Sequence, residues 1–297
     1  MILSLPTVIW YIVFSFIPMF GVIIAFKNYR LGDKGFIGDI LNSEWSGLEN
    51  FKFLFSTKDP IRAIINTLLY NSAFIVLGII IPVALAIMIT HLYNQKLAKS
   101  CQTAMFLPHF LSWVVASYFL FAFLSPDKGL VNNMLTGLGL EPIAWYSSAG
   151  TKYWPFILII MNIWKTTGYG MVVYLASITG IDTTYYEAAV IDGATKWQQI
   201  KHITIPIIKP VIIIMFIMAV GRIFNSDFGL FYQVPKNSGA LMNATLTIDV
   251  YVYNALMRLN DFGMSSAAAL FQSVCGFVTI MIANSIVRKV DKENAFF

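Results

Sequence analysis

Charged side chains are scarce in this sequence of 297 residues. Asp, Glu, Lys and Arg together make up 12% of the chain, whereas 58% of the residues are hydrophobic and the mean hydropathy is +0.70. Soluble domains carry about 25% charged residues, so an ordinary soluble enzyme and a disordered protein are both excluded. The surplus of 20 Lys and Arg over 15 Asp and Glu is small and no basic run concentrates it, so nucleic acid is not an expected partner. The composition indicates an integral membrane protein.

Residues that bind metals or perform catalysis are equally few. The two cysteines and three histidines lie scattered along the chain, with no C-x-x-C pair, so no metal site is expected. The chain has neither the phosphate-binding pattern G-x-x-x-x-G-K-[ST] nor the hydrolase patterns H-E-x-x-H and G-x-S-x-G. These absences disfavour an integral-membrane enzyme, and no cofactor is expected in this chain.

Long apolar stretches are present instead. A helix needs about 20 residues to cross a hydrocarbon core of about 30 Å, and four stretches of that length contain no charge. Two more are each interrupted by one cation, Lys165 or Arg222. The sequence therefore predicts an all-α integral membrane protein with six transmembrane helices, at roughly 2–26, 63–90, 104–124, 153–178, 207–226 and 264–287.

The loops between these spans are too short to fold independently, since the longest has about 40 residues. A single transmembrane domain is therefore expected over residues 1–297. The first span has no basic leader and no clear cleavage site, so we expect a permanent helix rather than a secretion signal.

Cations are slightly concentrated on one side of the expected membrane. With six spans, both termini share a side with the 91–103 and 179–209 loops. These two loops and the C-terminal tail hold eight Lys or Arg against five Asp or Glu. Because positive charge favours the inner side, we expect both termini and these loops in the cytoplasm of a multi-pass cell-membrane protein.

The loop before the fifth span carries clear helix signals. Asp182 or Thr183 can cap a first short helix, and Gly193 permits a sharp bend. A second short helix then leads to Pro206 and Pro210, which we expect to start the next span. These signals alone fit equally well an amphipathic connector lying against the membrane.

The spacing of residues in this loop is more specific. Glu187-Ala188-Ala189 is followed after three residues by Gly193, and after nine more by Ile203-x-Ile205-Pro206. This resembles the pattern E-A-A-x3-G-x9-I-x-L-P, the EAA loop of permease subunits in binding-protein-dependent ABC importers, with Ile205 in place of Leu. Further stretches are similar to the complex-polysaccharide branch of sugar permeases, namely 17–29, 47–51, 66–68, 106–108, 163–165, 225–232, 272–273 and 284–289.

The resemblance implies an importer of the type I fold that carries carbohydrate. It implies as partners a second homologous permease, a cytoplasmic ABC ATPase dimer that binds the ATP and Mg, and an extracellular or periplasmic solute-binding protein. The loop would form a coupling helix seated on the ATPase. The residues implied in this coupling are Glu187, Ala188, Ala189, Asp192, Gly193 and Ala194.

Polar residues within the spans are candidates for the solute path, because lipid does not tolerate them and sugars bind amides, hydroxyls and aromatic faces. The candidates are Asn162, Lys165, Tyr169, Tyr174, Arg222, Asn225, Asp227 and Gln272. Lys165 could equally bond helix carbonyls or the second permease, and Arg222 could pair with Asp227.

A secondary transporter remains the alternative, since it too carries ionisable groups at depth. It would not need the EAA spacing, however, and the sequence shows no obvious pair of inverted halves. A scaffold or receptor subunit also stays open at this point.

Overall fold

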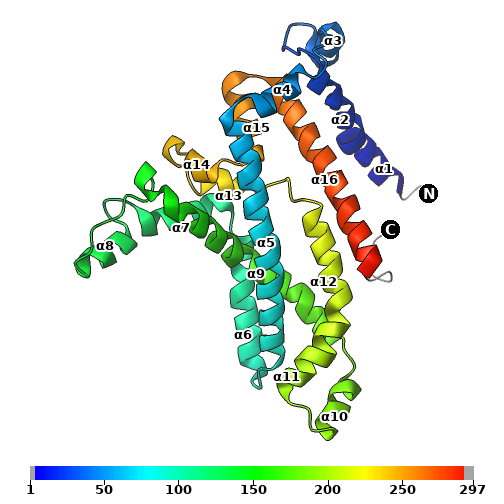
Figure 1. Cartoon of the computed structure of the whole chain (residues 1–297), viewed down its shortest axis with the longest axis vertical. Coiled ribbons are helices and arrows are strands. Elements are labelled where there is room, and N and C mark those ends of the chain that lie inside the picture. Colours follow the sequence, from blue (N-terminus) through cyan, green and yellow to red (C-terminus); the bar gives the residue numbers. More distant parts are fainter. Residues whose placement is uncertain (1–3, 291–297) are drawn as a thin grey trace.

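The computed structural model describes residues 4–290, and in this range regular structure is helical apart from one isolated bridge between Lys27 and Trp45. Five continuous helical stretches are long and apolar enough to cross a membrane, and a bent pair of helices makes a sixth. The five are Leu5–Phe26, Lys58–Thr90, Ser148–Thr179, Lys196–Val220 and Phe262–Lys289. The predicted all-α membrane fold is confirmed (Figure 1).

The centre of the bundle is an adjacent pair, α5 (Lys58–Thr90) and α9 (Trp154–Thr179), with α6 (Gln95–Phe106) against α9. Small residues allow this close approach. A Cβ on Gly170 would lie 3.2 Å from the Pro82 ring, and a Cβ on Gly168 would overlap the Met105 carbonyl.

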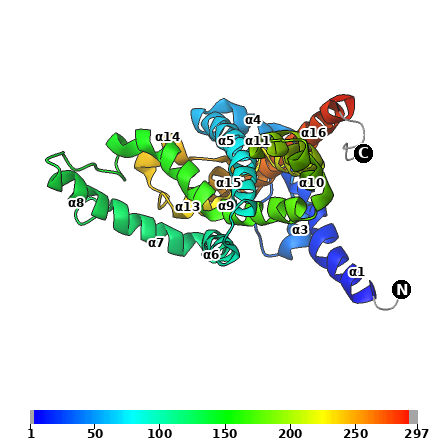
Figure 2. The same cartoon turned by 90° about the horizontal axis from the view of Figure 1, so that it is seen from below.

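The third expected span, 104–124, differs from a straight helix. After α6 comes a short 3₁₀ turn, η4 (Leu107–Phe110), and then α7 (Trp113–Leu124), which is bent by 101° from the preceding helix. Pro108 cannot extend the α-helical hydrogen bonding, and Ser112 is extended and caps α7 by accepting the Val115 N–H at 3.3 Å. Together, α7 and α8 (Leu130–Gly137) form an arm that leaves the bundle (Figures 1 and 2).

The fifth expected span, 207–226, begins earlier and ends earlier than predicted. Helix α11 (Lys196–Gln199) runs through a π-helical turn, η6 (Ile200–Thr204), into α12 (Ile205–Val220). The Ile205 N–H bonds the Ile200 carbonyl, so one wider turn accommodates Pro206, which has no N–H to donate. The two prolines therefore lie within a continuous helix rather than at its start.

The first span also accommodates a proline with a π-helical turn. Between α1 (Leu5–Tyr11) and α2 (Ile17–Met19), a π-helical turn, η2 (Ile12–Phe16), precedes Pro18, and η3 (Phe20–Phe26) completes the span. No residue of α1, η2 or α2 is buried, and only η3 packs against α16 (Phe262–Val290).

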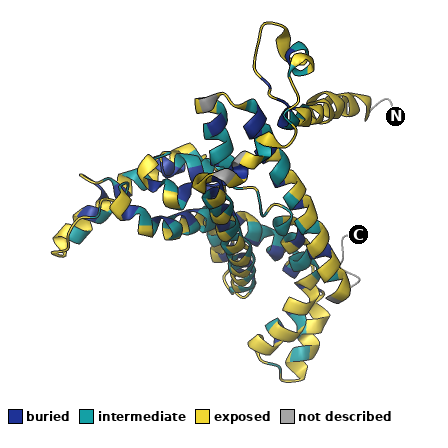
Figure 3. Ribbon diagram, turned by 45° about the horizontal axis from the view of Figure 1, so that its top comes forward, coloured by how far each residue is buried: buried dark blue, intermediate teal, exposed yellow. Residues whose placement is uncertain are grey.

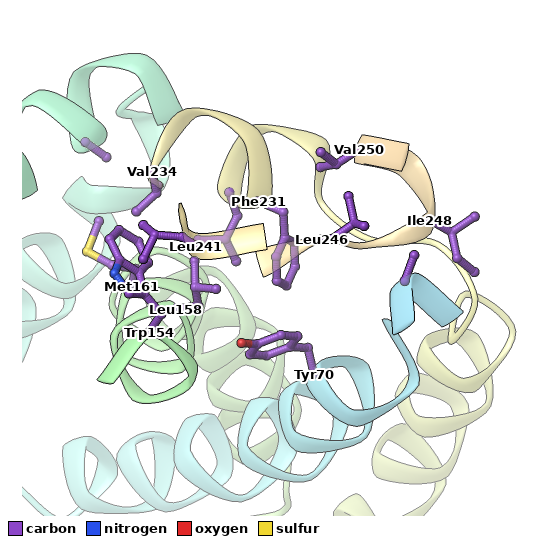
Figure 4. Close-up of a cluster of buried hydrophobic side chains, with 13 residues drawn as sticks. Tyr70, Trp154, Leu158, Met161, Phe231, Val234, Leu241, Leu246, Ile248 and Val250 are labelled. Carbon is purple, nitrogen blue, oxygen red and sulfur yellow. The ribbon is translucent and has the colours of Figure 1, made fainter. Parts of the chain in front are cut away.

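Short helices lie in the upper half of the molecule in Figure 1. They are α3 (Gly35–Asn42), α4 (Glu49–Ser56), α13 (Phe228–Gln233), α14 (Met242–Thr245) and α15 (Ile248–Leu259), together with the 3₁₀ turns η5 (Ser148–Tyr153) and η7 (Gly239–Leu241). A cluster of buried hydrophobic side chains joins α13, α14, α15 and η7 to α5 and α9 (Figure 4). In this cluster the rings of Tyr70 and Phe231 are 4.9 Å apart, and Trp154 is fully buried. Buried aromatic rings of this size contribute much of the packing energy.

Few residues of the spans are buried in the single chain, and intermediate and exposed side chains predominate (Figure 3). In none of the five continuous spans is more than 22% of the most apolar window buried. Apolar surface on this scale needs lipid or another membrane protein to cover it.

Candidate functional site

The lower end of the molecule is formed by α10 (Thr183–Ile191) and the turn after it. Asp182, rather than Thr183, caps this helix, and its Oδ1 accepts the Thr184 N–H at 2.9 Å. Hydrogen bonds from the Thr184 backbone and side chain stabilise the carboxylate and hold the pKa of Asp182 below its ordinary value.

Gly193 closes α10. The Ala194 N–H bonds the Ala189 carbonyl at 2.8 Å and the Gly193 N–H bonds the Val190 carbonyl at 3.1 Å, which is the Schellman arrangement. This arrangement requires a left-handed residue, and Gly193 has φ +78°. The glycine in the E-A-A-x3-G pattern is thus the helix terminator.

The following helix holds the turn in place. Thr195 and Gln198 form a reciprocal capping box at the start of α11. Gln199 is buried and donates to the Ala194 carbonyl at 3.2 Å, while the hydroxyls of Tyr186 and Thr204 lie 2.9 Å apart. The turn is therefore braced from both sides, and a hollow of about 410 Å³ adjoins it.

The outer face of this lower end is apolar and acidic. Glu187, Ala188, Asp192 and Gly193 are exposed, while Ala189 and Ala194 are half-buried. Neither acid forms a salt bridge within residues 4–290. Large exposed hydrophobic side chains surround them, namely Tyr185, Val190, Ile191 and Trp197. Such a patch is typical of a protein-binding surface.

Lys165 is held at the break in the third span. Its ammonium donates to the His109 carbonyl at 2.9 Å and the Leu111 carbonyl at 2.5 Å, and lies 5.3 Å from the centre of the Trp113 ring. Carbonyls at the end of a helix lack hydrogen-bond donors within the helix itself. The Lys165 ammonium provides the donors for these two carbonyls. The structure shows the carbonyl-bonding arrangement that the sequence left open for Lys165.

An exposed aromatic stack lies beside Lys165. The rings of Tyr169 and His109 are 4.8 Å apart at an interplanar angle of 14°, and Phe106 continues the stack. Tyr169 is 52% exposed. Asn162, one helical turn from Lys165, is half-buried and its carbonyl accepts the Thr166 hydroxyl at 2.8 Å.

A second break, at residues 221–227, separates α12 from α13. Side chains from three other elements bond its backbone. Asn71 donates to the carbonyls of Ile223 and Asn225, at 2.7 and 2.9 Å. Gln272 donates to the Phe224 carbonyl at 2.9 Å, and the Asp249 carboxylate accepts the Ser226 N–H at 2.6 Å. The predicted path residue Gln272 is buried and holds this break.

Arg222 and Asp227 do not pair with each other. The ion pairs among residues 4–290 are Lys52–Glu49 and Arg62–Asp59. Asp227 instead accepts the Trp113 indole N–H at 2.6 Å and the Leu230 N–H at 3.2 Å, which caps α13. Arg222 and Asn225 are exposed.

Tyr174 lies apart from these groups. It is 1% exposed, packed in the cluster that contains Ala86 and Met171, and its hydroxyl has no hydrogen-bond partner within the described chain. Asn71, Trp113 and Asp249 were not predicted from the sequence. An amide within the apolar second span was the available signal for Asn71, whereas Asp249 lies outside the predicted spans and gave none.

Among residues 4–290, no group of three or more His, Cys, Asp or Glu could hold a metal ion.

The chain is similar to known transport proteins over nearly its full length. It is 32% identical over 296 residues to Protein LplB of Bacillus subtilis, covering 99% of this chain and 90% of LplB. Identity is also 32%, over 300 residues, to the polygalacturonan/rhamnogalacturonan transport system permease protein YteP of the same species, covering 99% and 89% of the two chains.

Solved structures show the same fold. A chain of a bacterial ABC transporter involved in the import of the acidic polysaccharide alginate superposes with a TM-score of 0.86 at 32% identity, covering 97% of this chain and 94% of that one. The alginate transporter in complex with an alginate pentasaccharide-bound periplasmic protein gives a TM-score of 0.86 at 33% identity, with 98% and 94% coverage. Residues 78–292 match the profile of one family. The chain belongs to the family of binding-protein-dependent transport system inner membrane components.

Proposed function

We propose that this chain is a translocation subunit of an ATP-driven importer of oligosaccharides or glycan fragments. Relatives with a named cargo support carbohydrate as the solute class. They include permeases for polygalacturonan or rhamnogalacturonan, lactose and arabinooligosaccharides, and the transporter of alginate. A solute-binding protein delivers the cargo, as the family description implies.

The lower end of the molecule is the proposed contact with a separate ATPase. Glu187, Asp192 and the exposed hydrophobic side chains around them form one surface on a helix that is braced at both ends. In this proposal the ATPase dimer binds ATP and Mg and moves α10, with Ala188, Ala189 and Ala194 keeping the contact face narrow and Gly193 setting the bend. Nucleotide then stabilises one of two arrangements of the rigid helices, and this chain hydrolyses nothing itself.

The proposed solute path lies beside the two breaks, against a second permease. Tyr169 packs on His109 at the first break, Asn162 lies two turns before it on the same helix, and Arg222 and Asn225 belong to the second break. Aromatic faces, amides and guanidinium groups suit sugar rings and their hydroxyls. Lys165, Asp227, Gln272 and Tyr174 we assign to the framework, because they are bonded to backbone or buried.

The cation distribution and the family give the proposed orientation. Both termini and α10 face the cytoplasm, and α3, α4 and α13–α15 face outward toward the solute-binding protein. The large exposed apolar surface of the spans then contacts lipid and the second permease.

The observation that carries the proposal is the braced α10 turn with its exposed apolar and acidic face, in a chain of this family. The test is affinity purification of the chain from its native membrane, followed by an ATPase assay. We expect an ATPase and a second permease to co-purify, with ATP hydrolysis stimulated by solute-loaded binding protein.

The variant E187A should lower this stimulation by about tenfold, the size expected for a residue central to an interface. E141A is the matched control, because Glu141 is also an exposed acid but follows α8, which lies far from α10 (Figure 1). A chain that purifies alone and moves solute without any ATPase would instead establish the secondary-transporter alternative.

A further inference from the structure

The two breaks meet at one side chain. Trp113 is the first residue of α7, directly after the break in the third span, and Asp227 is the last residue of the second break, which follows the end of the fifth span. We infer that Trp113 is a positioning residue of the translocation path, which fixes the two breaks relative to each other. This inference deepens the proposed function and rests on it for its effect on transport.

The link to the second break is a short, charge-assisted hydrogen bond. The Trp113 indole N–H donates to Asp227 Oδ2 at 2.6 Å. The other carboxylate oxygen of Asp227 accepts the Leu230 N–H, so the same side chain ties α7 to the start of α13. Hydrogen bonds to an ionised acceptor are about twice as strong as neutral ones.

The link to the first break uses the face of the same ring. The Lys165 ammonium lies 5.3 Å from the ring centre while it donates to the His109 and Leu111 carbonyls. The indole therefore lies between a cation and a carboxylate, attracting the first through its π face and the second through its N–H. The charge of Lys165, which lies within the membrane span that ends at Thr179, is costly without such partners.

The backbone of α13 is shaped to receive the ring. A Cβ on Gly229 would overlap the edge of the Trp113 ring, so the ring rests directly on that backbone. Farther along the arm, the Lys236 ammonium lies 3.3 Å from the centre of the Phe121 ring and so adds a second tie between α7 and the segment after α13. The arm and this segment therefore behave as one body.

The consequence concerns the proposed solute path. Tyr169 packs on His109 beside the first break, whereas Arg222 and Asn225 belong to the second. The spacing of these two groups depends on the bond between Trp113 and Asp227. Loss of that bond should misplace the solute-contacting groups without unfolding either helix pair.

The test compares W113F with W154F in the purified complex. W113F keeps an aromatic ring beside Lys165 but loses the indole N–H. W154F also loses one indole hydrogen bond, from Trp154 to the Trp145 carbonyl at 2.7 Å, but neither residue of this bond belongs to either break. We expect W113F to lower ATP-driven oligosaccharide transport per complex about tenfold, the cost of one bond to a charged group, and W154F to keep more than half of it.

Asp227 provides the second half of a double-mutant cycle. D227A should lower transport at least as much as W113F, because it removes the α13 cap as well as the bond to Trp113. W113F/D227A should be no worse than D227A alone, because D227A has already removed the bond that W113F removes. D227N should recover only part of the loss, since its single amide oxygen can accept either the indole N–H or the Leu230 N–H, whereas the carboxylate accepts each with a different oxygen. Effects that multiply in the double variant, or equal losses in W113F and W154F, would overturn the inference.

A distance measurement tests whether Trp113 fixes the two breaks relative to each other, even in a complex that does not transport solute. Spin labels are placed at Phe119 on α7 and Met218 on α12, both more than half exposed, after Cys101 and Cys275 are replaced by Ser. We expect one narrow distance distribution with Trp113 and a clearly broader one in W113F. An unchanged distribution in W113F would refute the inference, whereas failed transport by the wild type alone would refute only the proposed function.

Discussion

Gly193 shows how a single residue shapes the proposed coupling surface. Its φ of +78° lies in the left-handed region, yet no atom lies within 4 Å of the position that a Cβ would take. The cost of a side chain here is therefore backbone strain alone, about 1–2 kcal/mol for an ordinary L-residue. We predict that G193A folds but lowers binding-protein-stimulated ATPase activity several-fold, and that G193N, which tolerates this conformation better, lowers it less.

The control for Gly193 lies thirteen residues earlier. Gly180 ends α9 with φ −82°, and a Cβ there would meet only ordinary contacts at 3.5 Å or more. G180A should leave the stimulated ATPase rate unchanged. An equal loss in G180A and G193A would show that the left-handed turn is not the relevant feature.

Tyr174 is predicted to tolerate removal of its hydroxyl. The group is buried and unpartnered within the described chain, a situation that costs rather than gains stability. Y174F should therefore match or exceed the wild type in thermal unfolding temperature and should transport normally. Reduced uptake with normal amounts of folded complex would instead place the hydroxyl in the solute path.

Asp182 makes the stability of helix α10 depend on pH. Its pKa is lowered from 3.8 by hydrogen bonds from Thr184, so the folded state favours the carboxylate. The stabilisation is thus fully present above the unfolded-state pKa and is lost as pH falls through the lower folded-state value. We predict that the difference in stimulated ATPase rate between wild type and D182A stays constant from about pH 5 to 8. A difference that changes within that range would contradict this assignment of the cap.

At the scale of elements, the close contact between α6 and α9 depends on Gly168. A Cβ there would overlap the Met105 backbone, which cannot rotate away as a side chain would. We predict that G168A lowers the stability of the folded complex by roughly 1–3 kcal/mol or prevents its assembly. G78A is the control, because Gly78 lies within α5 with open space around it. Equal thermal unfolding of the two variants would refute the tight contact.

Hydropathy predicted most of the helices but not their breaks. The stretches ending at Phe26, Thr90 and Thr179 are close to the expected spans, because about 20 apolar residues can cross a membrane only as a helix. The start of the fifth span was misplaced because a π-helical turn accommodates Pro206 without ending the helix. The bend near Pro108 was missed because an apolar stretch has the same hydropathy whether its helix is straight or broken.

The partners within the site could not be predicted for a different reason. Lys165 bonds carbonyls 54 and 56 residues away, and Trp113 bonds a carboxylate 114 residues away. The sequence supplies residue types and local spacing, so it identified Lys165 and Asp227 as unusual within spans but gave no signal for what binds them. The local EAA spacing, in contrast, identified the α10 turn because the backbone bonds that close the turn, from Gly193 and Ala194, reach back at most five residues.

At the scale of the whole molecule, the exposed spans point to an obligate assembly. The first span is largely unburied, with Phe14 65% and Phe20 69% exposed. An exposed apolar surface of this size on the spans should be covered by the second permease as well as by lipid. We predict that expression without the second permease lowers the amount of chain in the membrane several-fold, measured by quantitative immunoblotting. Equal amounts with and without the partner would contradict an obligate pair.

The most direct test of the proposed importer is uptake by proteoliposomes. The complex is reconstituted with the solute-binding protein outside, labelled oligosaccharide outside, and ATP with Mg²⁺ sealed inside. We expect the vesicles to accumulate label above the outside concentration with ATP, and to accumulate none with a non-hydrolysable analogue, even when an ion gradient is imposed. Accumulation driven by the ion gradient without ATP hydrolysis would contradict an ATP-driven importer.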